Sequence, residues 1–362
     1  MTELEQARKI INSTDEEMAR LFQQRMDAVR MVANHKKQHG LPIEDPAREE
    51  QLIERNSSFI DEEEYRSYYV EFLRSTIETS KKFQRRLLDG MRVAYSGVEG
   101  AFANIVAERI FPDACCVGYS DFDAAYKAVE NGECDAALLP IENSFNGDVG
   151  KVLDLSFFGS LYINGVYEAE IVQNLLGVKG SSLESIKRVT SHPQALGQCA
   201  PYIKAHDFEQ IEAVNTAVAA KMVAEANDIS LAAIGSEEAA EKFGLVKLEG
   251  HINENSNNTT RFGVFSRMRR EPSNADGRFI MLFTVKNVAG SLGKAVSVIG
   301  EHGFNLRALK SRPTKDLVWD YYFYAEGEGN ISSYEGRKML TELESCCNSV
   351  KILSSYEKEQ KV

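Results

Sequence analysis

The sequence predicts a multidomain protein: an all-α region at residues 1–90, a two-lobed α/β region at 91–270 and an α+β region at 275–362. An apolar stripe with heptad-like spacing over residues 4–35 indicates a long amphipathic helix in the first region. In the second region strand-like and helix-like patterns alternate, which is typical of an α/β fold. The third region shows the order β-α-β-β-α-β, which is that of the ferredoxin-like split motif.

The composition excludes several classes of protein. A chain of 362 residues is long enough for two or three domains with cores of their own. Its net charge of −12 argues against a nucleic-acid partner, because the basic footprint is missing. The first residues lack the apolar core of a signal peptide, and no run approaches the ~18 apolar residues of a membrane span. We therefore expect a cytoplasmic, soluble protein without a membrane partner.

The six cysteines show neither a CxxC ladder nor the histidine spacing of a zinc site. Free cysteines in a cytoplasmic protein are mostly buried, reduced thiols. We therefore expect structural cysteines, and we expect neither a metal nor a cofactor.

The first region is expected to form three helices. The first helix follows the apolar stripe and ends at Gly40. The second begins with Asp45 as its N-cap, and the third opens with a capping box of Asp61 and Glu64 and runs to about residue 88. Three helices cannot close a large core alone, so a helical dimer is expected to bury their apolar faces.

A basic residue, Arg25, interrupts the apolar stripe of the first helix. Such an arginine could extend its head to solvent or pair with a carboxylate. However, Lys36 lies three turns further along nearly the same face. Other donors follow at helical spacings, and a pocket rich in cations and amides suits a small substrate with two carboxylates. These further donors are Arg8, Arg48, Ser80 and Gln84.

The spacing of these residues resembles the all-helical chorismate mutases. The matching positions are Arg8, Asp15, Arg25, Lys36, Asp45, Arg48, Glu49, Ser80 and Gln84. The resemblance implies a dimer of intertwined long helices, in which Arg8 reaches the site of the partner subunit. It implies that the arginines bind the carboxylates of chorismate and that Lys36 and Gln84 donate to the ether oxygen of the breaking bond. Asp45 and Glu49 would hold the substrate hydroxyl.

The chemistry of this family suits such a set of residues. Rearrangement of chorismate to prephenate is unimolecular and transfers no proton, so its site needs no nucleophile, acid or metal. The site must hold a near-attack conformer and place fixed positive charge at the ether oxygen. An alternative is that the helical region only dimerises the chain.

Polar residues follow strand-like runs at several points in the second region. In open α/β folds, residues at such positions bind small ligands. Taken one at a time, each could merely cap a helix, whereas together they indicate one cleft between two lobes. The strings are Tyr95–Gly100, Pro140–Ser144 with Gly147, Ser191–Gln198, Asn215–Ala217, Ala233–Ser236 and Asn258–Phe262.

This series of strings resembles the prephenate dehydratase family. The resemblance implies a two-lobed, periplasmic-binding-like domain that removes the ring carboxylate of prephenate as carbon dioxide and the C4 hydroxyl as water, giving phenylpyruvate. Thr260 would donate a hydrogen bond to the leaving hydroxyl, aided by the charge of Arg261. The implied substrate-binding residues are Asn143, Ser144, Ser191, Gln198, Arg261 and Phe262.

Two other residues of these strings are of types that can transfer protons. Glu142 is a rival proton donor, because burial can raise the pKa of a carboxyl group. His192 is interpreted as a structural turn residue and not as a base, because no carboxylate partner is evident beside it.

The third region follows a polar stretch at residues 271–277, which we interpret as a linker. Its motifs Ala289–Leu292 and Lys310–Pro313 resemble those of the ACT domain, which binds phenylalanine as a feedback inhibitor. The implied effector-binding residues are Gly290, Ser291, Leu292, Ser311, Arg312 and Pro313. Strands are expected at 279–285, 306–310, 318–325 and 350–354, and helices at 292–302 and 334–346.

Two residues depart from the pattern of that family. Ser291 stands where alanine is usual, and Lys310 stands where glutamate is usual. Reversing a charge near an amine-binding site can weaken the capture of a zwitterion. We expect phenylalanine as the effector, and the alternative is a module that only dimerises.

The leading interpretation is a bifunctional enzyme of phenylalanine biosynthesis that forms a homodimer or a higher homo-oligomer. The alternatives are a monofunctional dehydratase with a helical dimerisation arm, and a non-catalytic protein that senses an amino acid, because two-lobed clamps and ACT domains also occur without catalysis. Arogenate as a further substrate and direct transfer of the intermediate between sites are both compatible with the sequence.

Overall fold

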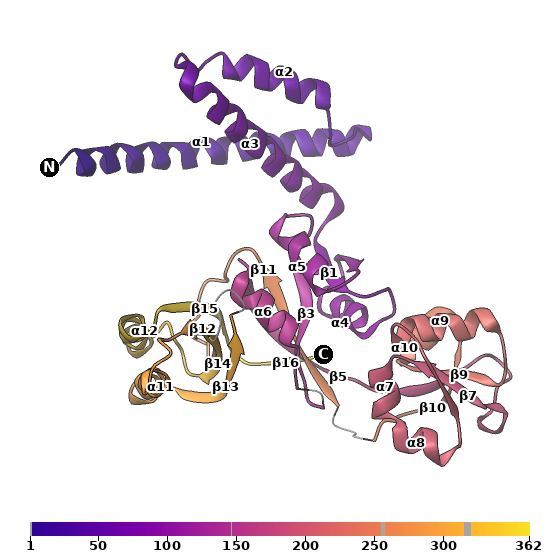
Figure 1. Ribbon diagram of the computed structural model, residues 1–362. Helices are drawn as coiled ribbons and strands as arrows, with labels where there is room; N and C mark the ends of the chain where they lie inside the picture. Colours follow the sequence, from indigo (N-terminus) through magenta and orange to yellow (C-terminus); the bar gives the residue numbers. More distant parts are fainter. Residues whose placement is uncertain (1, 146, 255–257, 315–319) are drawn as a thin grey trace. The chain divides into compact units, whose positions relative to one another are not determined.

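The computed structural model describes residues 2–145, 147–254, 258–314 and 320–362 (Figure 1). The chain divides into two compact units, Met1–Arg92 and Val93–Val362. Among the described residues, no helix is long and apolar enough to cross a membrane. The six cysteines, all of them described, form no disulfide.

The first unit consists of three helices, α1 (Glu3–His39), α2 (Pro46–Ser57) and α3 (Glu63–Asp89). The structure confirms Gly40 as the C-cap of α1, in the left-handed region at φ 62°, and Asp45 as the N-cap of α2. The predicted capping box at Asp61 is wrong, because the N-cap of α3 is Glu62. Figure 1 shows that the N-terminal half of α1 extends beyond the other two helices of this unit.

The apolar stripe of α1 is largely exposed in the single chain. Leu4, Ile11, Met18 and Leu21 have exposed fractions between 43 % and 60 %, and Ala33 is the buried residue of this helix. A stripe of this kind stabilises a helix only when another surface covers it.

The second unit begins with a mixed sheet of strand order β16-β5-β11-β3-β1-β2, in which β4 pairs with β3. Buried alanines and branched residues such as Leu139 and Ile141 form its core with Tyr126 and Phe265. Its strands are β1 (Arg92–Ser96), β2 (Cys115–Tyr119), β3 (Ala136–Asn143), β4 (Gly147–Asp148), β5 (Tyr162–Glu170), β11 (Thr259–Ser266) and β16 (Gln360–Lys361), and its helices are α4 (Phe102–Ile110), α5 (Phe122–Glu130) and α6 (Gly150–Phe158).

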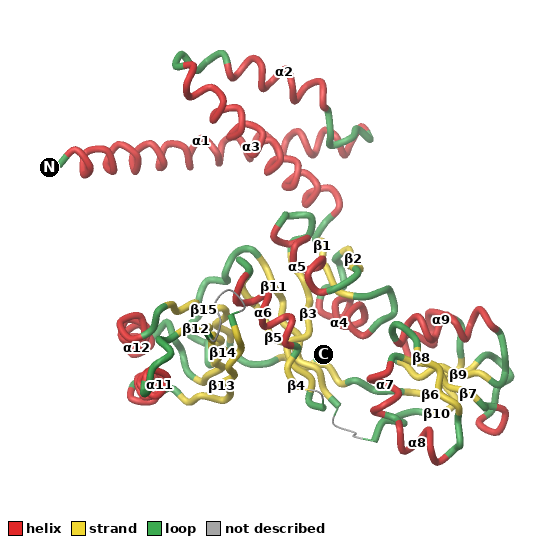
Figure 2. The backbone as a smooth tube through the Cα atoms, in the orientation of Figure 1, coloured by secondary structure: helices red, strands yellow, loops and turns green. Residues whose placement is uncertain are grey.

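A second lobe lies between β5 and β11 in the sequence and has its own sheet, of order β10-β6-β9-β7-β8 (Figure 2). The expectation of two lobes, with the strand from Gly165 leading into the second one, is therefore confirmed. The strands are β6 (Asn174–Gly177), β7 (Arg188–Ser191), β8 (Glu209–Glu212), β9 (Leu231–Gly235) and β10 (Val246–Glu249), and the helices are η1 (Leu183–Ser185), α7 (Pro193–Gln198), α8 (Ala200–Ala205), α9 (Thr216–Ala226) and α10 (Glu237–Phe243).

The C-terminal region forms an antiparallel sheet of order β13-β14-β12-β15, which confirms the ferredoxin-like motif. Residues 318 and 319 of the third predicted strand lie outside the described residues. The elements are β12 (Arg278–Thr284), α11 (Ser291–Glu301), β13 (Asn305–Pro313), β14 (Tyr321–Glu328), α12 (Tyr334–Cys346) and β15 (Ser349–Tyr356).

This C-terminal sheet is not a separate tail. One face of the sheet packs against α11 and α12, and Phe279 and Phe283 belong to the core between them. The opposite face, which includes Leu282 and Tyr322, shares a core with the first lobe. The prediction of a polar linker at 271–277 is therefore only partly right, because Asp276 in this stretch is buried and pairs with Arg270.

The ends of two strands also differ from the prediction, and in both cases the strand includes residues of a predicted motif. Pro140–Asn143 belongs to strand β3 instead of a turn, because pairing with β11 continues to its end. The Lys310–Pro313 motif likewise lies within β13, which pairs with β14 as far as Pro313. Neighbouring motif residues therefore point to opposite faces of a sheet.

Candidate active sites

The helical unit brings three of its predicted site residues together on α1 and α3. Arg25 Nη1 donates to the Ser80 hydroxyl, and one turn later Gln84 is also buried. Burial lowers the pKa of the Arg25 guanidinium. Among the described residues the Gln84 Oε1 atom is buried without a hydrogen-bond partner. Because Oε1 is an acceptor, a ligand hydroxyl between the two helices would satisfy it, while the amide N–H groups of Gln84 are the donors of this side chain.

The residues around the loop between α1 and α2 contact groups of this loop and of α3. Lys36 Nζ donates to the Ile43 carbonyl oxygen at 2.6 Å. Asp45 accepts a hydrogen bond from the backbone N–H of Arg48 at 3.1 Å, and the Arg48 side chain is exposed. Glu49 pairs with Lys81 at 3.2 Å, a partner that we did not predict from the sequence.

Arg8 lies apart from this group within one chain. It precedes Arg25 by seventeen residues on the same helix. At 1.5 Å per residue, this separation is about 25 Å along the helix axis.

In the second unit, a chain of buried amides surrounds Thr260. Asn143 and Thr260 are directly opposite each other on β3 and β11, and Asn143 Nδ2 donates to Thr260 Oγ1 at 2.9 Å. Because Oγ1 accepts this hydrogen bond, the proton of the Thr260 hydroxyl points elsewhere. The geometry therefore leaves Thr260 able to act as a donor.

The amide chain continues across the segments that join the two lobes. Asn143 Nδ2 also donates to Asn258 Oδ1 at 3.0 Å, and Asn258 Nδ2 donates to Gln198 Oε1 at 3.0 Å. Gln173 Nε2 reaches the same Gln198 oxygen at 3.4 Å. All of these residues are buried.

Gln173 and Asn258 were missing from our set of candidate residues. Asn258 lies in the string Asn258–Phe262, and the sequence signal for Gln173 is an amide that interrupts an apolar run. Among the described residues Gln173 Oε1 is buried without a partner.

The remaining predicted residues of this site have structural contacts. Ser191 is fully buried and donates to the Ile234 carbonyl oxygen at 2.6 Å, which ties β7 to β9. The Ser144 hydroxyl accepts from the Thr259 N–H at 3.0 Å, and Phe262 is buried in β11. His192 caps α7 by accepting from the Gln194 N–H, as expected of a turn residue.

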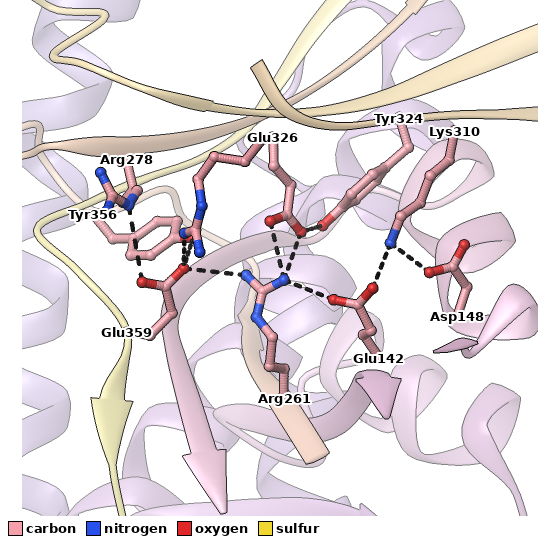
Figure 3. Close-up of polar contacts among 10 residues, drawn as sticks. Glu142, Asp148, Arg261, Arg278, Lys310, Tyr324, Glu326, Tyr356 and Glu359 are labelled. Atoms are coloured by element: carbon pink, nitrogen blue, oxygen red, sulfur yellow. Dashed lines mark hydrogen bonds and ion pairs between the residues drawn. The ribbon is translucent and has the colours of Figure 1, made fainter. Parts of the chain in front are cut away.

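Arg261 lies on the opposite face of the sheet from Thr260, contrary to our expectation that its charge acts beside that hydroxyl. Adjacent residues of a strand alternate between faces. Its guanidinium contacts Glu142 at 2.9 Å, Glu326 at 3.0 Å and Glu359 at 3.4 Å (Figure 3). Burial alone would lower the pKa of Arg261, but Glu326 and its neighbours raise it further than burial lowers it.

Glu142 belongs to this same face, and its surroundings argue against the role of proton donor. Burial raises the pKa of its carboxyl group, but hydrogen bonds from Lys310 and Arg261 lower the pKa by more, so the net shift is downward. Glu142 is therefore held as a carboxylate near neutral pH. Thr260 stays the candidate donor.

The candidate effector residues divide between two surfaces. Arg312 forms a bidentate ion pair with Asp154 in α6, at 2.8 and 3.1 Å, and Lys310 contacts Glu142 at 2.9 Å. Both therefore face the first lobe. Ser311 and Pro313 point the other way and are exposed, and Gly290 precedes α11 in the left-handed region at φ 85°.

Comparisons with known proteins agree with both sets of motifs. The family model for prephenate dehydratase matches residues 93–270, and that for chorismate mutase type II matches residues 7–85. A bifunctional chorismate mutase/prephenate dehydratase of Aquifex aeolicus is 31 % identical over 99 % of this chain and 99 % of its own. An arogenate dehydratase/prephenate dehydratase of Arabidopsis thaliana is 33 % identical, covering 74 % of this chain and 72 % of its own.

A solved structure is similar to about three quarters of the chain. The prephenate dehydratase of Arthrobacter aurescens, in complex with L-Phe, has a TM-score of 0.68 and 26 % identity, covering 74 % of this chain and 90 % of its own. These findings confirm the resemblances that the two sets of motifs carry. The chain belongs to the family of bifunctional chorismate mutase/prephenate dehydratases.

Proposed function

We propose that the chain catalyses two consecutive steps of phenylalanine biosynthesis, each at its own site. The helical unit rearranges chorismate to prephenate, and the cleft around Thr260 converts prephenate to phenylpyruvate. The observation that carries the proposal is the presence, in one chain, of the Arg25–Ser80 contact beside Gln84 and of the Asn143–Thr260 pair. The first set supplies fixed donors, and the second supplies an oriented hydroxyl.

At the first site, Arg25 and Arg48 bind the two carboxylates of chorismate and hold the enolpyruvyl side chain over the ring. Lys36 and Gln84 then donate to the ether oxygen as negative charge develops on it. Asp45 and Glu49 hold the substrate hydroxyl. Lys36 leaves its Ile43 contact to do so, which a flexible lysine can do at low cost because the carbonyl can bind water instead.

At the second site, the bond between the ring and its carboxylate breaks, and its electron pair enters the ring as carbon dioxide leaves. The C4–O bond breaks as the ring becomes aromatic, and the electron pair of this bond leaves with the oxygen. The Thr260 hydroxyl donates a hydrogen bond to this oxygen as it leaves, and the hydroxide becomes water by taking one proton from the solvent. Asn143 fixes the direction of the Thr260 hydroxyl, and Gln198 and Asn258 line the position of the ring.

We further propose that the helical unit works as a dimer. The exposed stripe of α1 supports this, as does the distance of about 25 Å between Arg8 and Arg25, which one chain cannot close. In a dimer of intertwined helices, Arg8 of one subunit completes the site of the other.

A mixture of two defective chains tests this arrangement. If Arg8 acts on the partner's site, a mixed dimer of Arg8→Ala and Lys36→Met chains has one site with both defects and one intact site. After unfolding and refolding together, the mixture should therefore show about a quarter of the wild-type mutase activity. Activity that stays at the level of the separate variants would contradict the shared site.

The C-terminal region is proposed to be an ACT domain that binds phenylalanine through Gly290–Leu292 and the exposed Ser311 and Pro313. Its ferredoxin-like fold supports this, together with the L-Phe present in the similar Arthrobacter structure. Arg312 already pairs with Asp154, so it would act in phenylalanine binding only if that ion pair opens.

One coupled assay tests the proposal as a whole. The protein is supplied with chorismate, prephenate and phenylpyruvate are followed together, and phenylalanine is then titrated. We expect prephenate to form first and phenylpyruvate to follow, with phenylalanine lowering the second rate. A protein that converts neither compound would contradict the proposal.

A further inference from the structure

Two successive positions of the ladder between β3 and β11 carry two different pairs of residues. Asn143 is opposite Thr260, and the adjacent Glu142 is opposite Arg261. Because successive side chains of a strand alternate, the two pairs lie on opposite faces of the sheet. The 2.9 Å hydrogen bond between Asn143 and Thr260 and the 2.9 Å ion pair between Arg261 and Glu142 agree with this. A shift of β3 against β11 that displaces Glu142 and Arg261 therefore also displaces Asn143 and Thr260.

The C-terminal domain contacts the pair of Glu142 and Arg261 on the face of the sheet opposite to Thr260. Arg261, whose side chain is 14 % exposed, contacts Glu326 of β14, whose side chain is 5 % exposed. The Tyr324 hydroxyl donates to the same Glu326 at 2.5 Å. Figure 3 shows these side chains converging on Arg261 from the C-terminal sheet, with Lys310 beside Glu142.

Lys310 occupies a specific place in this arrangement. Glu142 and Asp148 are directly opposite each other on the antiparallel strands β3 and β4. Like charges in that position destabilise a strand pair. Lys310 Nζ lies between them, at 2.9 Å from Glu142 Oε1 and in contact with Asp148 Oδ1. The lysine therefore neutralises a repulsion within the hairpin that β3 and β4 form, in which Asn143 is the next residue after Glu142.

We propose that Lys310 is a positioning residue for the dehydratase reaction, which the C-terminal domain contributes to the first lobe. By holding Glu142 and Asp148 together, Lys310 keeps Asn143 in register with Thr260, so that the Thr260 hydroxyl points at the leaving group. The inference rests on the proposed role of Thr260. It also gives a role to the lysine that departs from the ACT pattern.

The test compares two lysines that reach from the C-terminal sheet to the first lobe. Lys310→Met should lower the kcat for prephenate about tenfold, equivalent to about 1.4 kcal/mol of barrier, with KM changed less than kcat. Lys351→Met is the matched control, since Lys351 Nζ contacts the carbonyl oxygens of Ser156 and Gly159, away from the hairpin. It should leave kcat within about twofold. Mutase activity, measured on the same samples, should be unchanged in both variants.

A second substitution makes the charge argument specific. Removing one of the two opposed carboxylates also removes the repulsion, so Lys310→Met/Asp148→Asn should recover most of the lost kcat, and Lys310→Arg should be close to wild type. A Lys310→Met enzyme with normal kcat, or a double variant without recovery, would overturn the proposal. If Lys310→Met does not fold, the double variant and Lys310→Arg decide alone, since both must fold and be active. Thr260→Val on the same assay separates the two failures: an active Thr260→Val enzyme refutes the proposed donor and with it the role of Lys310, whereas a normal Lys310→Met kcat beside an inactive Thr260→Val enzyme refutes the role of Lys310 alone.

Discussion

Thr260→Val should lower phenylpyruvate formation by about 10²–10³-fold, while prephenate accumulates from chorismate. Valine keeps the shape of the β-branched side chain but cannot donate a hydrogen bond. The leaving hydroxide would then depart without stabilisation from the protein, and Asn143 would lose the acceptor to which it donates at 2.9 Å. The measurement is the kcat for prephenate in steady state.

Thr260→Ser is the control for this prediction. Serine keeps the hydroxyl, so we expect it to retain most of the activity, with some loss because its side chain is less fixed in rotation. If Thr260→Val is as active as the serine variant, the hydroxyl takes no part in the reaction.

Lys36→Met should lower the rate of prephenate formation by about 10²–10³-fold. Methionine has a similar length and can pack along the same helix, but it brings no charge to the ether oxygen. The dehydratase site does not use Lys36, so the variant should convert supplied prephenate at the wild-type rate. The measurement is the disappearance of chorismate.

The neighbouring Lys37 provides a matched control. It is exposed in the last turn of α1, and the same substitution there alters the net charge equally. Lys37→Met should leave both activities within about twofold of wild type. Equal losses in Lys36→Met and Lys37→Met would point to destabilised helices and contradict a specific role for Lys36.

The sequence was sufficient for the order of the elements, and it named Asn143 and Thr260 as candidate residues, which the structure brings into hydrogen-bond contact. Asn143 is the last residue of β3 and Thr260 the second residue of β11, and residues at strand ends of an α/β fold gather in one cleft. The long stripe of α1 and the β-α-β-β-α-β order were equally readable, because both depend on local periodicity.

What the sequence did not reveal depends on contacts between distant segments. Glu326 and Glu359 join Arg261 from 65 and 98 residues away, and no local pattern indicates such a meeting. Asp276 looked like part of a linker because it is polar, yet it is buried with Arg270 as its partner. The orientation of Arg261 can be predicted from the sequence, since the alternation of side chains along a strand places Arg261 and Thr260 on opposite faces of the sheet.

Lys310 illustrates a different difficulty. Judged against the ACT pattern, it appeared only as a departure that could weaken binding of an effector. The structure places it between Glu142 and Asp148, two carboxylates whose proximity arises from the pairing of β3 with β4. The function of a charge therefore depended on partners that the motif itself does not contain.

The most direct test of two separate sites in one chain is to supply both Lys36→Met and Thr260→Val enzymes with chorismate and, separately, with prephenate. We expect Thr260→Val to stop at prephenate, and Lys36→Met to form phenylpyruvate from prephenate but hardly any from chorismate. If either substitution removes both activities, or if neither removes one, the assignment of one reaction to each site is wrong.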